Sequence, residues 1–245
     1  MDVAPVRKAD VLRQRIEEMC QTRIKDSRGR IVTIGEIASK EAGSLEVKNS
    51  VVALISTVLA MRQKWEQTAQ PRLEAFKTNY SQIKTLHDLK TLMESMDERE
   101  FCAEVLGIQV KKTPFWRYVM LKELINALTY HGKVRGFRDD WDAIQDWARA
   151  VDINDLQSDV VGKIKDVGLA TVQNLRLTCG VDTVKPDVHV KKALKEIGLG
   201  NEVQVVELLS ELTGYSRREL DQIFWYWDKS RSTKEEISLD KFEKL

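Results

Sequence analysis

The sequence has few cysteines, few prolines and no long apolar run. Cys20, Cys102 and Cys179 are far apart and follow no metal-ligand spacing, which argues against a disulfide framework and indicates a reducing compartment. Three cysteines are one too few for a four-cysteine iron–sulfur cluster. The opening "MDVAPVRKAD" has no apolar core, so we expect no signal peptide and a cytoplasmic protein.

Helical periodicity dominates the chain. Apolar residues recur at helical spacing almost everywhere and sustained β-alternation is missing, so the sequence predicts an all-α protein. Arg30–Gly35 is a candidate strand or an irregular connection. The most apolar run, Val51–Met61, is too short to span a bilayer and predicts a helix buried at the centre of a bundle. We expect helices at 6–24, 35–42, 48–67, 70–78, 86–97, 99–106, 115–130, 139–150, 156–165, 170–179, 188–197, 202–212 and 216–229.

The overall charge does not indicate a nucleic-acid partner. The 39 basic and 38 acidic residues nearly cancel, so a DNA-binding protein of this composition must gather its basic groups on one face. The predicted loop Thr129–Asp140 has a local basic surplus, which fits either a DNA-lining or a plainly solvated loop. Near the C-terminus, the helical spacing of Leu220, Ile223, Phe224 and Trp227 indicates a packing face.

The segment "SDVVGKIKDVGLATVQNLRLTCG" predicts two short helices that meet at a tight turn around Gly168. Such a turn presents unpaired amides at the start of a helix, which is an arrangement suited to phosphate. Lys163 and Lys165 before the turn and Arg176 after it supply charge for a nucleic-acid backbone. The same stretch is compatible with a plain αα-hairpin that has a glycine at its corner.

The segment "DTVKPDVHVKK" places Asp187 in a turn just before a predicted helix. An aspartate at this position is a good helix N-cap, and it is also able to carry the chemistry of a site. Pro186 restricts the preceding residue and fixes the entry to the helix. We expect His189 to brace the turn rather than to act as an acid or base.

These two segments, in this order, resemble the signature of the helix-hairpin-helix (HhH-GPD) DNA glycosylases, the superfamily of endonuclease III and the 3-methyladenine glycosylases. The resemblance covers residues 48 to about 228. Between 160 and 195 it rests on matching motif residues, and elsewhere it rests only on the order of the predicted helices. It implies a two-lobed fold: a six-helix barrel lobe at 49–176 that includes the hairpin at about 159–178, and a second lobe that joins segment 1–48 to 177–245, with a cleft between them. The matching residues are Val167, Gly168 and Thr171, followed by Asp187, His189 and Val190.

The resemblance implies a monofunctional DNA N-glycosylase, which flips a damaged or modified base out of double-stranded DNA and removes it by hydrolysis. Asp187 becomes the catalytic carboxylate, because an oxocarbenium-like sugar requires a nearby negative charge. Pro186 and His189 become its structural support. The end of the long predicted helix supplies wedge or pocket candidates: Met61, Arg62, Gln63 and Trp65. The predicted DNA-binding residues are Lys163, Lys165, Val167, Gly168, Ala170 and Thr171.

The sequence departs from the family pattern at two hairpin positions. Ala170 occupies the place of the lysine nucleophile of bifunctional members, so we expect no β-lyase activity. Asp166 replaces the first hairpin glycine, which weakens a phosphate contact if the side chain faces DNA; we expect it instead to cap the second helix. The resemblance allows a monovalent cation on the hairpin carbonyls and implies no metal, no iron–sulfur cluster and no other cofactor.

The sequence does not identify the base that is removed. Alkylated, oxidised and deaminated bases fit DNA repair by base excision, whereas a hypermodified phage base fits antiviral defence. We expect a monomer that binds DNA and no membrane. Two alternatives remain: a non-catalytic helix-hairpin-helix protein that recognises lesions or a partner, and a helical interaction module without a DNA role.

Overall fold

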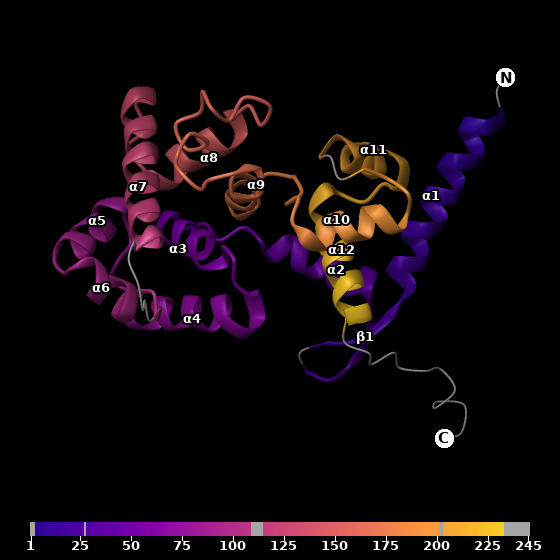
Figure 1. The fold of residues 1–245 in the computed structure, drawn as a ribbon, viewed down its shortest axis with the longest axis horizontal. Coiled ribbons are helices and arrows are strands. Elements are labelled where there is room, and N and C mark those ends of the chain that lie inside the picture. The colour runs from indigo at the N-terminus through magenta and orange to yellow at the C-terminus, as the bar shows by residue number, and fades with distance from the viewer. Residues whose placement is uncertain (1–2, 27, 109–114, 201–202, 233–245) are drawn as a thin grey trace. The chain divides into compact units, whose positions relative to one another are not determined.

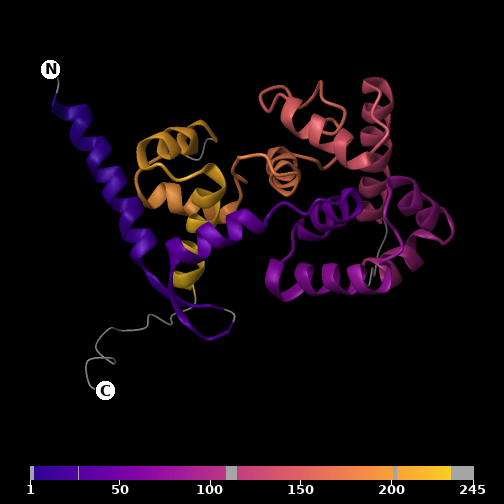
Figure 2. The same cartoon turned by 180° about the vertical axis from the view of Figure 1, so that it is seen from behind.

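The computed structural model describes residues 3–26, 28–108, 115–200 and 203–232. It is mostly helical, which confirms the all-α prediction (Figures 1 and 2). The chain divides into two compact units. The central unit is Glu46–Val181, and the terminal unit combines Met1–Leu45 with Asp182–Leu245. The limits predicted for a six-helix barrel lobe were 49 and 176.

The described part of the terminal unit is helical apart from one short β-hairpin. Strands β1 (Arg23–Lys25) and β2 (Ile31–Thr33) pair antiparallel, so the candidate strand at 30–35 exists in part, whereas the helix predicted at 6–24 ends early. Thr33 then caps α2 in a capping box with Glu36, which explains why a helix follows the strand directly. The helices are α1 (Val3–Gln21), α2 (Ile34–Ser44), α10 (Val188–Glu196), α11 (Val203–Thr213) and α12 (Arg217–Ser232).

The central unit is built around α3 (Ser50–Ala60), as its apolar sequence predicted. Nine of its eleven residues are buried, and the Asn49 side chain caps its start by accepting the Val52 amide. The helices around it include two short π-helical segments, η1 and η2. Their bounds are η1 (Trp65–Ala69), α4 (Gln70–Asn79), α5 (Leu86–Glu94), α6 (Glu98–Glu100), η2 (Phe101–Val105), α7 (Trp116–Arg135), α8 (Asp140–Ala150) and α9 (Leu169–Thr178).

Helix α3 ends at Ala60, although the sequence predicted a helix to residue 67. The cause is a contact made by a residue that is distant in sequence. Arg117, from α7, donates from Nη2 to the Met61 carbonyl at 2.6 Å and from Nε to the Val58 carbonyl at 3.4 Å. These carbonyls belong to the end of the helix and need partners, so the guanidinium terminates it in place of a local cap.

Residues 156–165 were predicted as a helix, and they form a series of turns instead. The Asp159 carboxylate accepts the amides of Val161 and Gly162, each at 2.8 Å, and the Trp147 indole N–H at 3.1 and 3.2 Å. An aspartate that binds nearby amides offers the backbone an alternative to the helical ladder. Gly162 is needed here, because a Cβ at this position would collide with the Leu156 carbonyl oxygen.

Helix α7 continues through most of the segment predicted as the loop 129–140, so that prediction is wrong as far as Arg135. His131 Nε2 lies 2.9 Å, and Arg135 Nε 3.3 Å, from Asp146 Oδ2 on α8. The hydrogen bond from His131, with one from Arg135, lowers the pKa of the Asp146 carboxyl. Two basic residues of the segment for which a DNA-lining and a solvated loop were both considered therefore pair with a neighbouring helix.

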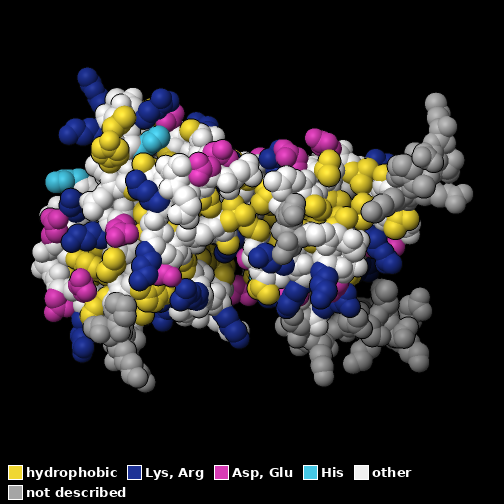
Figure 3. Space-filling view, turned by 45° about the horizontal axis from the view of Figure 1, so that its top comes forward, with side chains coloured by type: hydrophobic (Ala, Val, Ile, Leu, Met, Phe, Trp, Pro, Cys, Tyr) yellow, Lys and Arg dark blue, Asp and Glu magenta, His cyan; other side chains and the backbone are white. Residues whose placement is uncertain are grey.

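On the face drawn in Figure 3, the basic side chains of the central unit are interspersed with acidic ones. Within the described ranges, none of the helices has the length and apolar character that a bilayer crossing requires.

Candidate functional site

The predicted helix-hairpin-helix is only half present: residues 156–165 form turns, so the turn between residues 163 and 168 leads into a single helix, α9. The Val167 amide donates to the Ile164 carbonyl at 3.0 Å, and Asp166 adopts a left-handed conformation with φ +67°. This conformation normally favours glycine and is tolerated by aspartate better than by most other residues. Lys163 and Lys165 are exposed, whereas Val167 is buried in the core of the central unit.

Helix α9 begins immediately after this turn, with Gly168 as its N-cap. The Gly168 carbonyl accepts the amides of Thr171 and Val172 at 2.9 and 3.0 Å. The amides of Leu169 and Ala170 make no hydrogen bond with any described residue, and no side chain caps the helix. The predicted capping by Asp166 is therefore wrong. Two free donors remain at the positive end of a helix, in the geometry that binds anions.

Gly168 itself leaves open space above these amides. A Cβ added to it would meet no atom within 4 Å, and its φ of −118° is accessible to any residue. The glycine is therefore not required by the fold. It keeps the surface at the start of α9 free of side-chain atoms, which suits close approach of another molecule.

Two side chains anchor helix α9 within the central unit, and one of them, Arg176, was predicted to contact DNA phosphate. Arg176 donates from Nε to the Ala148 carbonyl at 2.8 Å and from Nη1 to Gln173 at 2.8 Å, so its guanidinium joins α9 to α8. Asn174 lies 3.4 Å from the Thr57 hydroxyl on α3. The phosphate-contacting role predicted for Arg176 is replaced by this structural one.

The wedge candidates lie on an exposed segment between α3 and η1. Arg62 has φ +55° and a side chain that is 71% exposed, and Trp65 is 37% exposed; Met61 and Gln63 are half-buried. A left-handed arginine is uncommon and indicates local backbone strain. The segment is held at its first residue, because the Met61 carbonyl is bound by Arg117.

The wedge segment and the hairpin turn lie beside each other within the central unit. Arg62 Nη2 is 3.6 Å from Asp166 Oδ1, although the two residues are about a hundred positions apart in sequence. The Arg62 guanidinium also lies 5.4 Å from the Trp116 ring centroid, and that of Arg117 lies 4.0 Å from it. Burial, with repulsion from Arg72 and Arg62, lowers the pKa of Arg117 to about 10.

In the terminal unit, Asp187 is the N-cap of α10, as its position in the sequence predicted. Its Oδ1 accepts the amides of His189 at 2.9 Å and Val190 at 3.3 Å. The Asp187 amide donates to the Lys185 carbonyl at 2.7 Å and closes a three-residue turn centred on Pro186, whose ring fixes a suitable φ. Oδ2 lies 3.9 Å from the Lys185 ammonium, and the Asp187 side chain is 24% exposed.

His189 links α10 to α12. Its Nδ1 lies 2.6 Å from Asp228 Oδ2, and the Lys192 ammonium approaches the same carboxylate at 3.4 Å. The imidazole also meets the Trp225 ring edge to face, with 6.2 Å between centroids. The residue expected to brace the aspartate turn thus has partners on a second helix.

A second carboxylate near Asp187 was not predicted from the sequence. Asp221 on α12 is 8% exposed, and its Oδ1 accepts the Lys185 amide at 2.7 Å. Burial, with a contribution from the negative charge of Asp187, raises the pKa of Asp221 to about 7. A signal was present, because Asp221 and Asp228 are seven residues apart and share a helical face.

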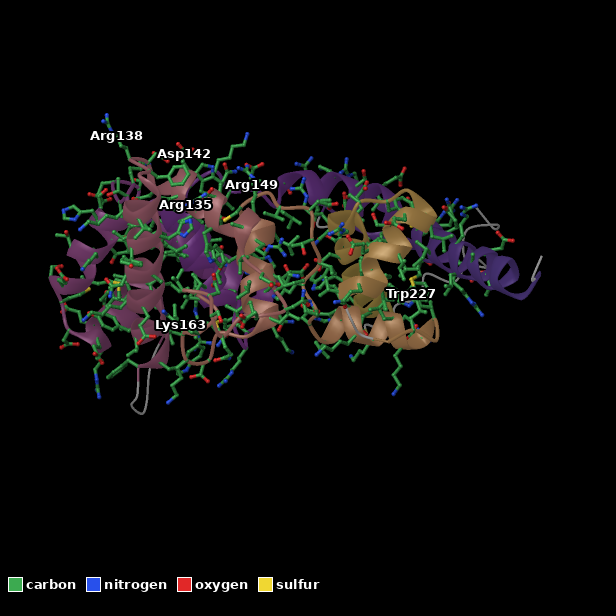
Figure 4. All side chains as sticks on the ribbon, turned by 90° about the horizontal axis from the view of Figure 1, so that it is seen from above. Arg135, Arg138, Asp142, Arg149, Lys163 and Trp227 are labelled. Carbon is green, nitrogen blue, oxygen red and sulfur yellow. The ribbon has the colours of Figure 1, made fainter. Side chains whose placement is uncertain are left out.

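The packing face expected on α12 is confirmed for three of its four residues. Leu220, Ile223 and Phe224 are fully buried. Trp227, labelled in Figure 4, is half-buried instead, and its indole N–H donates to Glu196 of α10 at 2.8 Å.

Figure 4 shows Lys163 on a different side of the central unit from Arg138 and Asp142. The basic residues around α7 and α8 therefore do not extend the hairpin surface. Among the described residues, no group of three or more histidine, cysteine or acidic side chains is placed to hold a metal ion. Cys20, Cys102 and Cys179 are free and buried.

Comparison with known proteins adds no family assignment: no family model, curated protein or solved structure matches the chain.

Proposed function

We propose that the protein is a monofunctional DNA N-glycosylase of the HhH-GPD type, with the central unit as its six-helix lobe. The observation that carries the proposal is the meeting of the hairpin turn and the wedge segment at the Arg62–Asp166 pair. One segment has two free amides and exposed lysines, and the other is exposed and strained. Phosphate binding and duplex penetration require these two kinds of element.

The hairpin turn binds the DNA backbone in this proposal. The free amides of Leu169 and Ala170 donate to a phosphate oxygen, and Lys163 and Lys165 add charge without reading sequence. The carbonyls of Lys165, Asp166 and Val167 accept no hydrogen bond from a described residue. Oxygen ligands of this kind fit a monovalent cation, which would supply positive charge next to the phosphate.

Segment 61–65 fills the space that the target nucleotide leaves when it rotates out of the helix. The side chains of Arg62, Lys64 and Trp65 are exposed, so they are available to enter a duplex. The Arg117 contact fixes the start of the segment, which lowers the entropy that is lost when the segment enters DNA.

Asp187 carries the chemistry. As the C1′–N bond breaks, its electron pair leaves with the base and positive charge develops on the deoxyribose, where the carboxylate stabilises it. A water molecule then adds to C1′ and gives a proton to Asp187, which leaves an abasic site. Ala170 provides no amine at the position of the usual lysine nucleophile, so the proposal includes no β-elimination.

The test is incubation with a panel of duplexes that carry alkylated, oxidised, deaminated or hypermodified bases, followed by alkali to reveal abasic sites on a denaturing gel. Asp187→Asn should abolish base release and keep DNA binding and stability, because asparagine is an equally good N-cap. Asp139→Asn is a matched control: Asp139 caps α8 in the same way, through the amides of Trp141 and Asp142.

Three outcomes would redirect the assignment. Undiminished release by Asp187→Asn would remove the carboxylate from the mechanism. DNA binding without release from any duplex would favour the non-catalytic alternative. Strand breaks that appear without alkali would contradict the monofunctional assignment and point to Lys185, whose ammonium lies 3.9 Å from Asp187.

A further inference from the structure

One face of α12 holds the segment that carries Asp187. The Arg218 amide donates to Asp182 Oδ1 at 3.0 Å, the Lys185 amide donates to Asp221 Oδ1 at 2.7 Å, and His189 bonds to Asp228. Figures 1 and 2 both show α10 beside α12. Asp221 and Asp228 are two helical turns apart, so they face the segment together.

The contact made by Asp221 differs from that of Asp182 in its burial, and from that of Asp228, which is equally buried, because Asp228 is paired with the His189 and Lys192 side chains. The other oxygen of Asp221, Oδ2, accepts the Gln222 side-chain amide at 3.2 Å, and Asp221 is 8% exposed. The charged groups that act on Asp221 are Lys185 and Asp187, both on the segment that leads into α10.

The other charged groups at the contacts of α12 have partners of their own. Glu219 bonds to Ser39 of α2, and Asp228 to His189 and Lys192 of α10. Toward α11, Arg217 pairs with Glu207.

A neutral acceptor would bind the Lys185 amide at a lower cost in folding free energy. Burial of a carboxylate is unfavourable, and a second carboxylate nearby adds repulsion; together they raise the pKa of Asp221 to about 7. An asparagine or a backbone carbonyl would accept the same hydrogen bond without this penalty. What the carboxylate adds is negative charge close to Asp187, and such charge is useful where a cation forms in a dry site.

We propose that Asp221 is a positioning carboxylate of the candidate active site, which fixes the Asp187 turn through the Lys185 amide and adds its negative charge to the stabilisation of the cationic sugar. This inference rests on the proposed glycosylase function. Asp221 acts through Lys185 and through its electrostatic field, and it does not itself contact the substrate.

Three variants separate the anchor from the charge. Asp221→Asn keeps an acceptor for the Lys185 amide and removes the charge, whereas Asp221→Ala removes both. Asp182→Asn is the matched control, since Asp182 also anchors the segment to α12 but is exposed to solvent. Single-turnover base release is measured between pH 5.5 and 8.5, together with the dissociation constant for uncleaved duplex.

The wild-type rate is expected to rise with pH around 7 as Asp221 ionises. At pH 8 Asp221→Asn should be slower by about tenfold, lack this rise and bind DNA unchanged. Asp221→Ala should be slower still, and Asp182→Asn should match the wild type. An unchanged rate and pH profile in Asp221→Asn, with loss only in Asp221→Ala, would identify a purely structural anchor and overturn the proposal.

A second measurement keeps this inference separate from the proposed function. The titration of the Asp221 carboxyl, followed by carbon-13 NMR, should move to lower pH in Asp187→Asn, because the repelling charge is removed. An unmoved titration would overturn the coupling of the two carboxylates whether or not any base is released. Absence of base release by the wild type from every duplex, with the titration moved, would instead refute the glycosylase function.

Discussion

The buried carboxylate of Asp221 makes a prediction about stability that does not depend on any activity. Replacement by asparagine keeps the acceptor for the Lys185 amide at nearly the same volume. It removes only the ability to ionise. The free energy of unfolding of the variant, compared with the wild type, should therefore reveal the cost of that ionisation as a function of pH.

The magnitude follows from the two pKa values of the group. The pKa is about 7 in the folded protein and 3.8 for a fully solvated aspartate, so the folded protein binds more protons between these values than the unfolded chain. Stability from this group is fully present below pH 3.8 and is lost as the pH rises from there through 7. Integrated from pH 4.5 to 8.5, the loss is about 3 kcal/mol, and Asp221→Asn should escape it.

Urea unfolding at pH 4.5 and at pH 8.5 tests this predicted loss of stability. Hydrogen exchange of α12 peptides reports on the terminal unit alone. The difference in unfolding free energy between Asp221→Asn and wild type should grow by about 3 kcal/mol in favour of the variant at pH 8.5. The other carboxylates are common to both proteins and cancel. Asp182→Asn, at an exposed anchor, should show no such growth. A difference that is the same at both pH values would refute the raised pKa and the argument built on it.

Four further predictions concern the hairpin and the core. Gly168→Ala should keep full stability, since its Cβ meets no atom, yet weaken DNA binding by about tenfold in a fluorescence anisotropy titration. Gly162→Ala should instead destabilise the central unit, because its Cβ would collide with the Leu156 carbonyl, as thermal unfolding would show. Lys165→Ala should weaken binding of all duplexes similarly and reduce the slope of log affinity against log salt by about 1. Leu54→Ala, at a fully buried position of α3, should lower the free energy of unfolding by about 3 kcal/mol in urea denaturation.

Features of the fold that depend on neighbouring residues in the sequence could be predicted. The buried helix α3 follows from its apolar composition, and the cap at Asp187 follows from an aspartate placed before a helical run. The end of α3 was not predictable. It depends on Arg117, which reaches the Met61 and Val58 carbonyls from more than fifty residues away.

Competition between side chain and backbone explains the helix that is missing from residues 156–165. The sequence has helical periodicity there, but Asp159 binds two amides and the Trp147 indole at once. Whether these residues form a helix or turns depends on the tertiary packing that brings the Trp147 indole to the Asp159 carboxylate. For the candidate site, the motif singled out Asp187 and the turn before α9, whereas Asp221 required knowledge of which helix packs on the Asp187 turn.

Several energetically unfavourable features of this molecule lie in, or pack against, the segments that the motif singled out. Of the three left-handed non-glycine residues described, Arg62 is in the wedge segment and Asp166 is in the hairpin turn. The free amides of Leu169 and Ala170 follow that turn, and the buried carboxylate of Asp221 holds the turn of Asp187. Local rules of stability are expected to be broken where function requires it, and these features break three different rules. Strain and unpaired donors in the central unit and a buried carboxylate in the terminal unit have independent physical causes, so their places in or against the motif segments add support to the proposal beyond the motif itself.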